Sequence, residues 1–447
     1  MSLFDGKRLT NDTFKLDVER MRRGWYSDKY FENINRMLTA LSAEGYRYEG
    51  HRHNLPSSIS PLEIATGDVE IEMQWFSRRP GMTVVVGVDK ALAMLRHCTG
   101  YFDGDNFVDT SGKLEVWSVE DGCTVQYGGD PASIQPVMRV CGRYRDFALL
   151  ETPTLGILTR SSRVATNVYE TFVAARGKPV LFFPARFDLH EVQAADGYAY
   201  NIAVQRFNLD HAKDLGPFIS TDAQGDWWGG AGGGTVAHAA IASFLGDTAE
   251  AMLQFARVLP ASTPRIALVD FNNDSVRDSL YVLETLFEKY RVLMDAHQPE
   301  EAAKYKLYGV RLDTSGSIRD VSVPPLGEPE LDLGVTPRLV FNVRQALDTA
   351  WQGWNIPAAW QEAARDYCHS VKIVVSGGFN PDRIRRFEHL GVPVDIYAVG
   401  SYLFNNNGAT VTDFTADVVR VKVHGRWLDM AKVGRSPGDN PDLKRVW

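Results

Sequence analysis

Short apolar runs alternate with helix-like segments from about residue 150 onward, and this alternation is the feature that most constrains the fold. The runs are PVLFFPARF (179–187), RIALVDF (265–271), LYGVRLDT (307–314), VKIVVSGGF (371–379) and VDIYAVGSYLF (394–404). Helical patterns such as DSVRDSLYVLETLFEKYRVLM and NPDRIRRFEHLG follow them. Fully apolar strands that alternate with helices are typical of a parallel β/α architecture. With about six or seven such units, the sequence favours an irregular β/α barrel over an open sheet.

The first 150 residues show a mixed pattern instead. YFENINRMLTALSAEG (30–45) is helix-like, and MTVVVGV (82–88) is strand-like. Residues 114–141 alternate short apolar runs with Gly, Pro and Asp turns, which predicts a small antiparallel β unit. Residues 413–434 predict a β-hairpin that turns at His424–Gly425. We therefore expect an N-terminal α/β sandwich-like domain over 1–150, completed by 405–447, and a barrel domain over 151–404.

Charge and composition argue against several classes of protein. The net charge of -8 argues against nucleic acid or an anionic membrane as the main partner. No run of about 18 apolar residues predicts a membrane span, and the N-terminus lacks an apolar signal core, so we expect a cytoplasmic protein. The cysteines form no CxxC pair, so we expect neither a zinc site nor a disulfide framework. They are Cys98, Cys123, Cys141 and Cys368.

Polar and glycine residues gather where the apolar runs end. In a β/α barrel the carboxyl ends of the strands form the active-site face. The residues at these ends are Phe183, Arg186, Asp270, Arg311, Asp313, Gly377, Gly378, Gly400 and Ser401. Together they offer cations, carboxylates and glycine turns to one cavity.

The stretch GGAGGGTVAH (229–238) places a glycine cluster directly before His238 and a helical segment. Glycine weakens regular structure, so the cluster indicates either a flexible surface loop or a backbone that approaches a ligand. Pairing of His238 with Asp270 would favour the imidazolium form. The alternative is a buried, hydrogen-bonded histidine.

Two late glycine turns, SGGFNPDRI and VGSYL, suit phosphate. A glycine turn before a helix leaves backbone N–H groups free, and barrels commonly bind phosphate after their last two strands. The alternative is that these glycines only make tight turns. No P-loop or strand-linked GxGxxG occurs, which argues against a nucleotide fold of those types.

Arg311 and Asp313 lie two residues apart, so both face one side of an extended strand. A cation and an anion placed there could hold an anionic ligand together with Mg²⁺-pyrophosphate. The alternative is an internal salt bridge between the two side chains.

Several motifs together resemble the nicotinate phosphoribosyltransferase family, which are type II phosphoribosyltransferases. They are SDKYFENINRML, ETPTLGILTRSS, GTVAH, GVRLDTSG, VVSGGF, VPVDIYAVGSYL and DFTADVVRVKV, in the family's order from about Tyr26 to Lys432. The resemblance implies that nicotinate reacts with phosphoribosyl pyrophosphate and Mg²⁺ to give nicotinate mononucleotide and pyrophosphate, in NAD biosynthesis. It also implies ATP hydrolysis coupled through a transiently phosphorylated histidine, and a homodimer or higher oligomer with shared active sites.

The resemblance assigns substrate contacts to several residues. Tyr30, supplied by the neighbouring subunit, would stack on one face of the pyridine ring and Phe183 on the other. Arg311 would recognise the ring carboxylate, and Arg186 would reach phosphoribosyl pyrophosphate. Thr235 of GTVAH would also contact substrate.

The resemblance assigns catalytic and phosphate-binding roles as well. His238 would be the phosphorylated histidine, with Asp270 as its carboxylate partner. Asp313 would be the acid near ribose and magnesium. The ribose 5-phosphate turns would be Gly377, Gly378, Gly400 and Ser401.

The chain departs from the family in places, and other functions stay open. The family often has two arginines where this chain has Arg186–Phe187, and RLDTSGSIRD differs from the commoner RxDSGD. The C-terminus has no cysteine-rich tail, so no zinc is expected. One alternative is a relative that uses nicotinamide, or that uses quinolinate, whose two carboxylates demand more cations. Others are a non-catalytic pyridine- or phosphate-binding regulatory protein and an unrelated barrel enzyme for sugar phosphates, which needs no aromatic plates.

Overall fold

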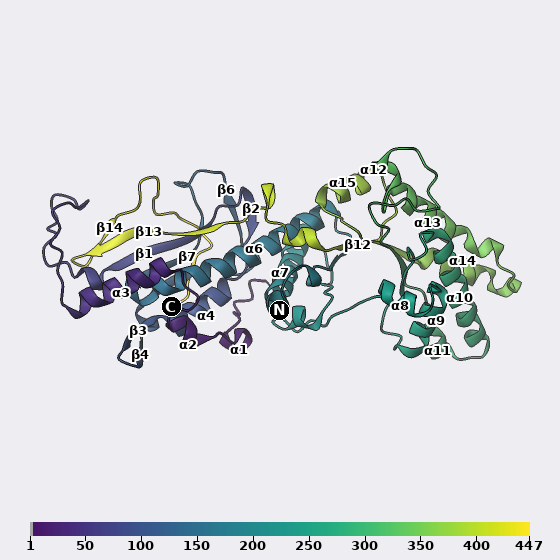
Figure 1. Cartoon of the computed structure of the whole chain (residues 1–447), viewed down its shortest axis with the longest axis horizontal. Coiled ribbons are helices and arrows are strands. Elements are labelled where there is room, and N and C mark those ends of the chain that lie inside the picture. The colour runs from purple at the N-terminus through teal and green to yellow at the C-terminus, as the bar shows by residue number, and fades with distance from the viewer. Residues whose placement is uncertain (1–2) are drawn as a thin grey trace. The chain divides into compact units, whose positions relative to one another are not determined.

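The computed structural model describes residues 3–447, and these residues form two units (Figure 1). The first unit contains the described chain up to Tyr169, together with Tyr198–Asp210 and Asn405–Trp447. The second unit contains Glu170–Gly197 and His211–Phe404. Three of the four boundaries between the units fall inside two long helices, α6 (Glu151–Ala174) and α7 (Gln193–His211), and the fourth lies between Phe404 and Asn405.

The first unit is built on a six-stranded sheet of order β14-β13-β1-β7-β5-β15. Its strands are β1 (Glu70–Ser77), β5 (Glu115–Ser118), β7 (Pro136–Arg143), β13 (Phe414–Val423), β14 (Arg426–Asp429) and β15 (Lys444–Arg445). The C-terminal β13 pairs antiparallel with β1, so the end of the chain completes this sheet. His424 and Gly425 take left-handed φ values of 48° and 76° between β13 and β14, which confirms the predicted hairpin.

The core of the first unit lies between this sheet and its helices. Helix α4 (Val88–Cys98) buries apolar residues such as Leu92 and Leu95 in one cluster with Met73 and Trp75 of β1. Two further strand pairs are β2 (Gly81–Val84) with β6 (Thr124–Tyr127) and β3 (Gly100–Asp103) with β4 (Asn106–Asp109). The remaining helices that begin in this unit before α6 are α1 (Asn11–Phe14), α2 (Val18–Arg22), α3 (Lys29–Ala43) and α5 (Tyr144–Phe147).

The second unit contains a five-stranded parallel sheet of order β8-β12-β11-β10-β9. Its strands are β8 (Val180–Phe182), β9 (Ile266–Leu268), β10 (Gly309–Leu312), β11 (Lys372–Val375) and β12 (Ile396–Val399). Each strand comes from one of the five apolar runs, and apolar residues of these strands form a buried cluster that includes Leu181, Ile266 and Val374. The predicted α/β class is confirmed. Fewer strands pair than the expected units, because near residue 219 only an isolated parallel bridge joins Ile219 to Phe182.

Helices lie between and after the strands of the second unit along the chain, and these helices are labelled in Figure 1. They are α8 (His238–Ser243), α9 (Thr248–Val258), α10 (Ser275–Asp295), α11 (Pro299–Ala303), α12 (Pro329–Asp332), α13 (Pro337–Thr349), α14 (Gln361–Ser370) and α15 (Pro381–His389). The side chains of Asp274, Thr336 and Asn380 accept N-terminal backbone N–H groups of α10, α13 and α15. No helix within residues 3–447 has both the length and the apolar character that crossing a membrane requires.

Candidate active site

A pocket of about 420 Å³ lies in the second unit, and its walls come from the segments that follow β8, β10, β11 and β12 and from the glycine-rich stretch. Most of the residues predicted from the sequence line it. These are Phe183, Arg186, Thr235, His238, Arg311, Asp313, Gly377, Gly378, Gly400 and Ser401. Parallel strands end at the same edge of a sheet, which is why residues so distant in sequence meet here.

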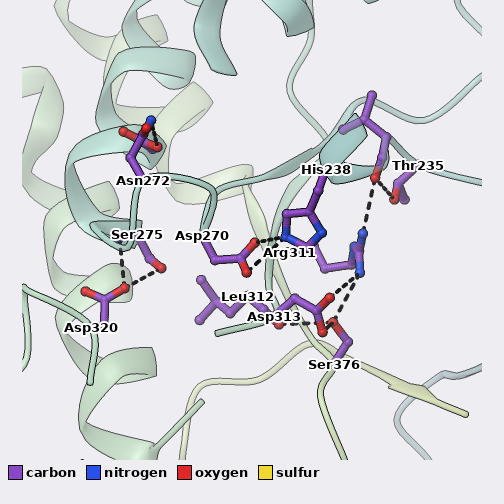
Figure 2. A network of polar contacts seen from close by, with 12 residues as sticks. Thr235, His238, Asp270, Asn272, Ser275, Arg311, Leu312, Asp313, Asp320 and Ser376 are labelled. Carbon is purple, nitrogen blue, oxygen red and sulfur yellow. Dashed lines mark hydrogen bonds and ion pairs between the residues drawn. The ribbon is translucent and has the colours of Figure 1, made fainter. Parts of the chain in front are cut away.

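His238 and Asp270 form an ion-pair geometry at one side of the site (Figure 2). His238 is the first residue of α8, and Asp270 follows β9 after one residue. The imidazole Nε2 lies 3.0 Å from Oδ1 and 3.1 Å from Oδ2 of the carboxylate. The His238 side chain is 47% exposed, so it is not the buried histidine of the alternative interpretation, whereas Asp270 is 8% exposed.

The chemistry of this pair follows from its asymmetric burial. Burial raises the pKa of the Asp270 carboxyl above its ordinary value, while the neighbouring His238 acts in the opposite direction. An Nε2–H that donates to the carboxylate leaves Nδ1 as the basic nitrogen of the ring. A solvent-accessible imidazole oriented in this way can act as a nucleophile or as a proton carrier.

Arg311 occupies the floor of the pocket with a side chain only 11% exposed. Its Nη1 lies 3.4 Å from Asp313 Oδ2 and 3.3 Å from Ser376 Oγ, and its Nη2 donates to the Val236 carbonyl oxygen at 3.1 Å (Figure 2). The internal salt bridge of the alternative interpretation is therefore present, but its contacts lie beyond the usual N–H···O range. A ligand carboxylate would offer this guanidinium shorter, paired hydrogen bonds.

Asp313 is fixed by a hydroxyl that the sequence analysis did not single out. Ser376 Oγ donates to Asp313 Oδ1 at 2.8 Å, and Asp313 is 26% exposed. Ser376 stands directly before the glycine turn of β11, so its position in VVSGG was a usable signal. The carboxylate thus keeps a partly open oxygen beside the pocket.

The two glycine turns follow neighbouring strands of the sheet. Val375 of β11 pairs with Tyr397 of β12, so the segments that begin at Ser376 and Gly400 lie side by side. Gly377 and Gly378 have φ values of 88° and 73°, which side chains rarely adopt. The Gly377–Gly378 turn therefore presents backbone to the pocket, as a phosphate site requires, and Gly400 and Ser401 of the neighbouring turn line the same pocket.

Phe187, which stands where the resembling family often has an arginine, leaves room only for glycine at position 400. A Cβ on Gly400 would lie 2.7 Å from Cε2 of Phe187. Phe187 also lies under the Arg186 guanidinium, whose carbon is 5.3 Å from the ring centroid. Arg186 is exposed and forms no ion pair with any side chain among residues 3–447. Arg186 thus supplies one cation that is unpaired within the described chain, and Phe187 supplies an apolar ring, where the resembling family often has two arginines.

In the glycine-rich stretch, some glycines are required by close packing and others line the pocket. A Cβ on Gly230 would lie 2.3 Å from the Trp228 ring, and one on Gly233 would lie 2.8 Å from the Phe218 ring. A Cβ on Gly234 would meet nothing within 4 Å, although Gly234 lines the pocket. The stretch is therefore neither a free surface loop nor wholly devoted to a ligand.

Two predicted residues do not line this pocket: Asp270, which contacts the lining residue His238, and Tyr30. Tyr30 lies in α3 of the first unit and is 58% exposed. Residues that line the pocket without having been predicted include Phe187, Ser220, Ser376 and Phe379, whereas Gly233 and Gly234 belong to the glycine cluster for which a ligand contact was one of two expectations. Of these, Ser220 carries no recognisable sequence signal, because its loop contributes only the isolated bridge at Ile219.

Comparison with known proteins relates this fold to phosphoribosyltransferases. Residues 61–162 match the family model for the N-terminal domain of quinolinate phosphoribosyl transferase. The nicotinate-nucleotide pyrophosphorylase structure from Pyrococcus furiosus has a TM-score of 0.62 and 22% identity, covering 96% of this chain and 85% of that one. Human nicotinic acid phosphoribosyltransferase has a TM-score of 0.53 and 16% identity, covering 89% and 75%. A search of curated protein sequences found no match. The chain shares the fold of these two proteins, in agreement with the predicted barrel architecture.

Proposed function

We propose that this protein transfers ribose 5-phosphate from phosphoribosyl pyrophosphate to nicotinate, forming nicotinate mononucleotide and pyrophosphate in NAD biosynthesis. The observation that carries the proposal is the position of Arg311, a nearly buried guanidinium in the same pocket as two glycine turns. A flat ring with one carboxylate suits a single arginine between apolar walls, and phosphate suits the turns.

Phe183 and Phe187 provide apolar walls for the pyridine ring. Such walls hold the ring nitrogen in line with the ribose carbon, so positioning supplies much of the rate. The exposed Arg186 binds the pyrophosphate group, whose charge grows as its bond to ribose breaks. In a homodimer, Tyr30 of the partner subunit would close the second face of the ring.

Magnesium fits this site through Asp313 and the substrate. No group of three or more potential metal-ligating side chains occurs in the described chain, so the substrate oxygens must supply most ligands. Asp313 keeps a partly exposed carboxylate beside the glycine turns. When bound, magnesium offsets the negative charge that develops on pyrophosphate.

His238 would couple ATP hydrolysis to synthesis. Its ring is accessible and is oriented by Asp270 at 3.0 Å, as a nitrogen nucleophile toward a phosphoryl group requires. The buried carboxylate stabilises the positive charge that the ring carries during transfer.

Quinolinate is the second candidate substrate, because residues 61–162 match the quinolinate family's N-terminal domain. Its second carboxylate would need another cation near the ring. Phe187 stands where the family often has an arginine, which favours the monocarboxylate.

The test is mononucleotide formation from phosphoribosyl pyrophosphate and Mg²⁺, with nicotinate, quinolinate or nicotinamide, each with and without ATP. We expect turnover of nicotinate, faster with ATP. Turnover of quinolinate would show that the substrate is quinolinate rather than nicotinate, and the class of reaction would stay the same. Binding of a pyridine without any turnover would favour a non-catalytic binding protein.

A further inference from the structure

Arg383 reaches back from α15 to the glycine turn that precedes the helix. Its Nη1 donates to the Gly377 carbonyl oxygen at 2.7 Å, and its Nη2 donates to the Val335 carbonyl oxygen at 2.6 Å. Its guanidinium carbon lies 4.2 Å from the centroid of the Phe379 ring. One half-buried side chain therefore joins the turn after β11 to the segment before α13.

The charge of Arg383 has no carboxylate partner among residues 3–447. Its hydrogen bonds go to two carbonyl oxygens, and the charged group that acts on it is the like-charged Arg386. Burial and that neighbour lower the pKa of the Arg383 guanidinium, which nevertheless stays charged because arginine is so basic. A net positive charge thus sits behind the Gly377–Gly378 turn.

The geometry fixes the direction of one backbone donor. In a trans peptide the C=O and N–H groups point to opposite sides. A Gly377 carbonyl held toward Arg383 therefore directs the Gly378 N–H away from it. A hydrogen bond from a cation to that carbonyl also polarises the amide and strengthens its N–H as a donor. Two successive glycines with positive φ would otherwise leave this peptide free to rotate.

We propose that Arg383 is a positioning residue for phosphate: it orients and polarises the Gly377–Gly378 turn so that the turn binds the 5-phosphate of a ribose phosphate. It acts through the backbone and touches neither the ring nor the bond that breaks. This inference rests on the proposed function for its substrate, but the binding of a sugar phosphate can be measured without any turnover.

The test measures binding of ribose 5-phosphate and of nicotinate to the full-length protein by isothermal titration calorimetry. We expect Arg383→Ala to lower the affinity for ribose 5-phosphate by roughly ten- to a hundredfold. This is the range for loss of charge-assisted hydrogen bonds. Nicotinate binding should change much less, because Arg311 is held by Asp313 and the Val236 carbonyl oxygen and contacts this segment only through Ser376 Oγ. Arg383→Lys keeps the charge without the two-pronged geometry, so its loss should be intermediate.

Arg385→Ala is the matched control, because Arg385 lies on the same helix, is 58% exposed and, within residues 3–447, pairs only with Asp382. It should bind both ligands as the wild type does. Equal weakening of both ligands by a folded Arg383→Ala, or no weakening of ribose 5-phosphate, would overturn the inference. If Arg383→Ala does not fold, Arg383→Lys decides by the same comparison.

Failure of the proposed function gives a different result. Suppose that the wild type binds ribose 5-phosphate, that Arg383→Ala abolishes this binding, and that the wild type forms no mononucleotide. These results would refute the proposed enzymatic activity and support the inference about Arg383. A wild-type protein that does not bind ribose 5-phosphate overturns the inference itself.

Discussion

The imidazole of His238 and the carboxylate of Asp270 lie 3.0 Å apart, although 32 positions separate them in the sequence. The glycine-rich stretch brings the start of α8 to the end of β9, and the carboxylate then engages Nε2. Because Asp270 is 8% exposed and His238 is 47% exposed, the anion is sheltered while the ring stays accessible. This arrangement suits a ring that accepts and releases a group.

Replacement of His238 should separate ATP coupling from synthesis. His238→Ala removes the nucleophile but leaves Arg311 and both glycine turns, so stimulation by ATP should disappear while slow ATP-independent synthesis remains. The measurement is mononucleotide formation with and without ATP. His369→Ala, on α14, is the control and should behave as wild type. Full ATP stimulation in His238→Ala would exclude a phosphohistidine.

Replacement of Arg311 should affect one substrate more than the other. Arg311→Ala should raise the KM for nicotinate by about ten- to a hundredfold, since a charged hydrogen-bonded contact contributes roughly 1.5–3 kcal/mol. The KM for phosphoribosyl pyrophosphate should change much less. Arg311→Lys should restore the KM for nicotinate only in part, because lysine lacks the planar, forked guanidinium group. An equal rise in both constants would refute the assignment to the ring carboxylate.

The sequence predicts the strands of the second unit well because buried parallel strands are apolar throughout. Each of β8 to β12 lies in one of the predicted runs, and residues that follow β8, β10, β11 and β12 line one pocket. Asn380, the N-cap of α15, is likewise the kind of residue that marks a helix start. These features depend on local patterns, which a single sequence carries.

Contacts between segments that are distant in the sequence were harder to predict from the sequence. Nothing local indicates that the Phe187 ring covers Gly400, and the position of Ser376 in VVSGG marks a turn without indicating that its Oγ bridges to Asp313. The glycine cluster gave an ambiguous signal, because Gly230 packs against Trp228 while Gly234 faces the pocket. Such contacts arise from tertiary packing, which propensity and periodicity do not encode.

The contact between Gly400 and Phe187 predicts a rescue. Gly400→Ala places a Cβ 2.7 Å from the ring, so the ring or the turn must move, at a cost of about 1–3 kcal/mol. We expect weaker binding of ribose 5-phosphate, measured by calorimetry. Adding Phe187→Ala should restore part of the affinity by removing the clash. Gly353→Ala, where a Cβ meets nothing within 4 Å, is the control. A double variant no better than Gly400→Ala would show that the contact is unimportant.

Asp121 in the first unit should make stability depend on pH. It accepts hydrogen bonds from the Val88 backbone N–H at 2.9 Å and the Tyr198 hydroxyl at 3.2 Å. Burial, and then the nearby Asp89, raise its pKa to about 7, from an ordinary value of 3.8. A raised pKa means that the folded state holds the proton more tightly than the unfolded chain. This contribution to stability is fully present below about pH 4 and is lost as the pH rises to about 7.

Asp121→Asn should therefore stabilise the protein above neutral pH, because it keeps an acceptor for Val88 and removes the charge. The gain should be on the order of 2–4 kcal/mol at pH 8 and should vanish toward pH 4, as a pKa difference of this size implies. Thermal unfolding of both proteins between pH 4 and pH 9 checks this, with exposed Asp382→Asn as the control. Parallel profiles for the wild type and Asp121→Asn would show that Asp121 does not titrate in this range. A gain confined to acidic pH would mean that the carboxylate is stabilised in the fold, against the burial that surrounds it.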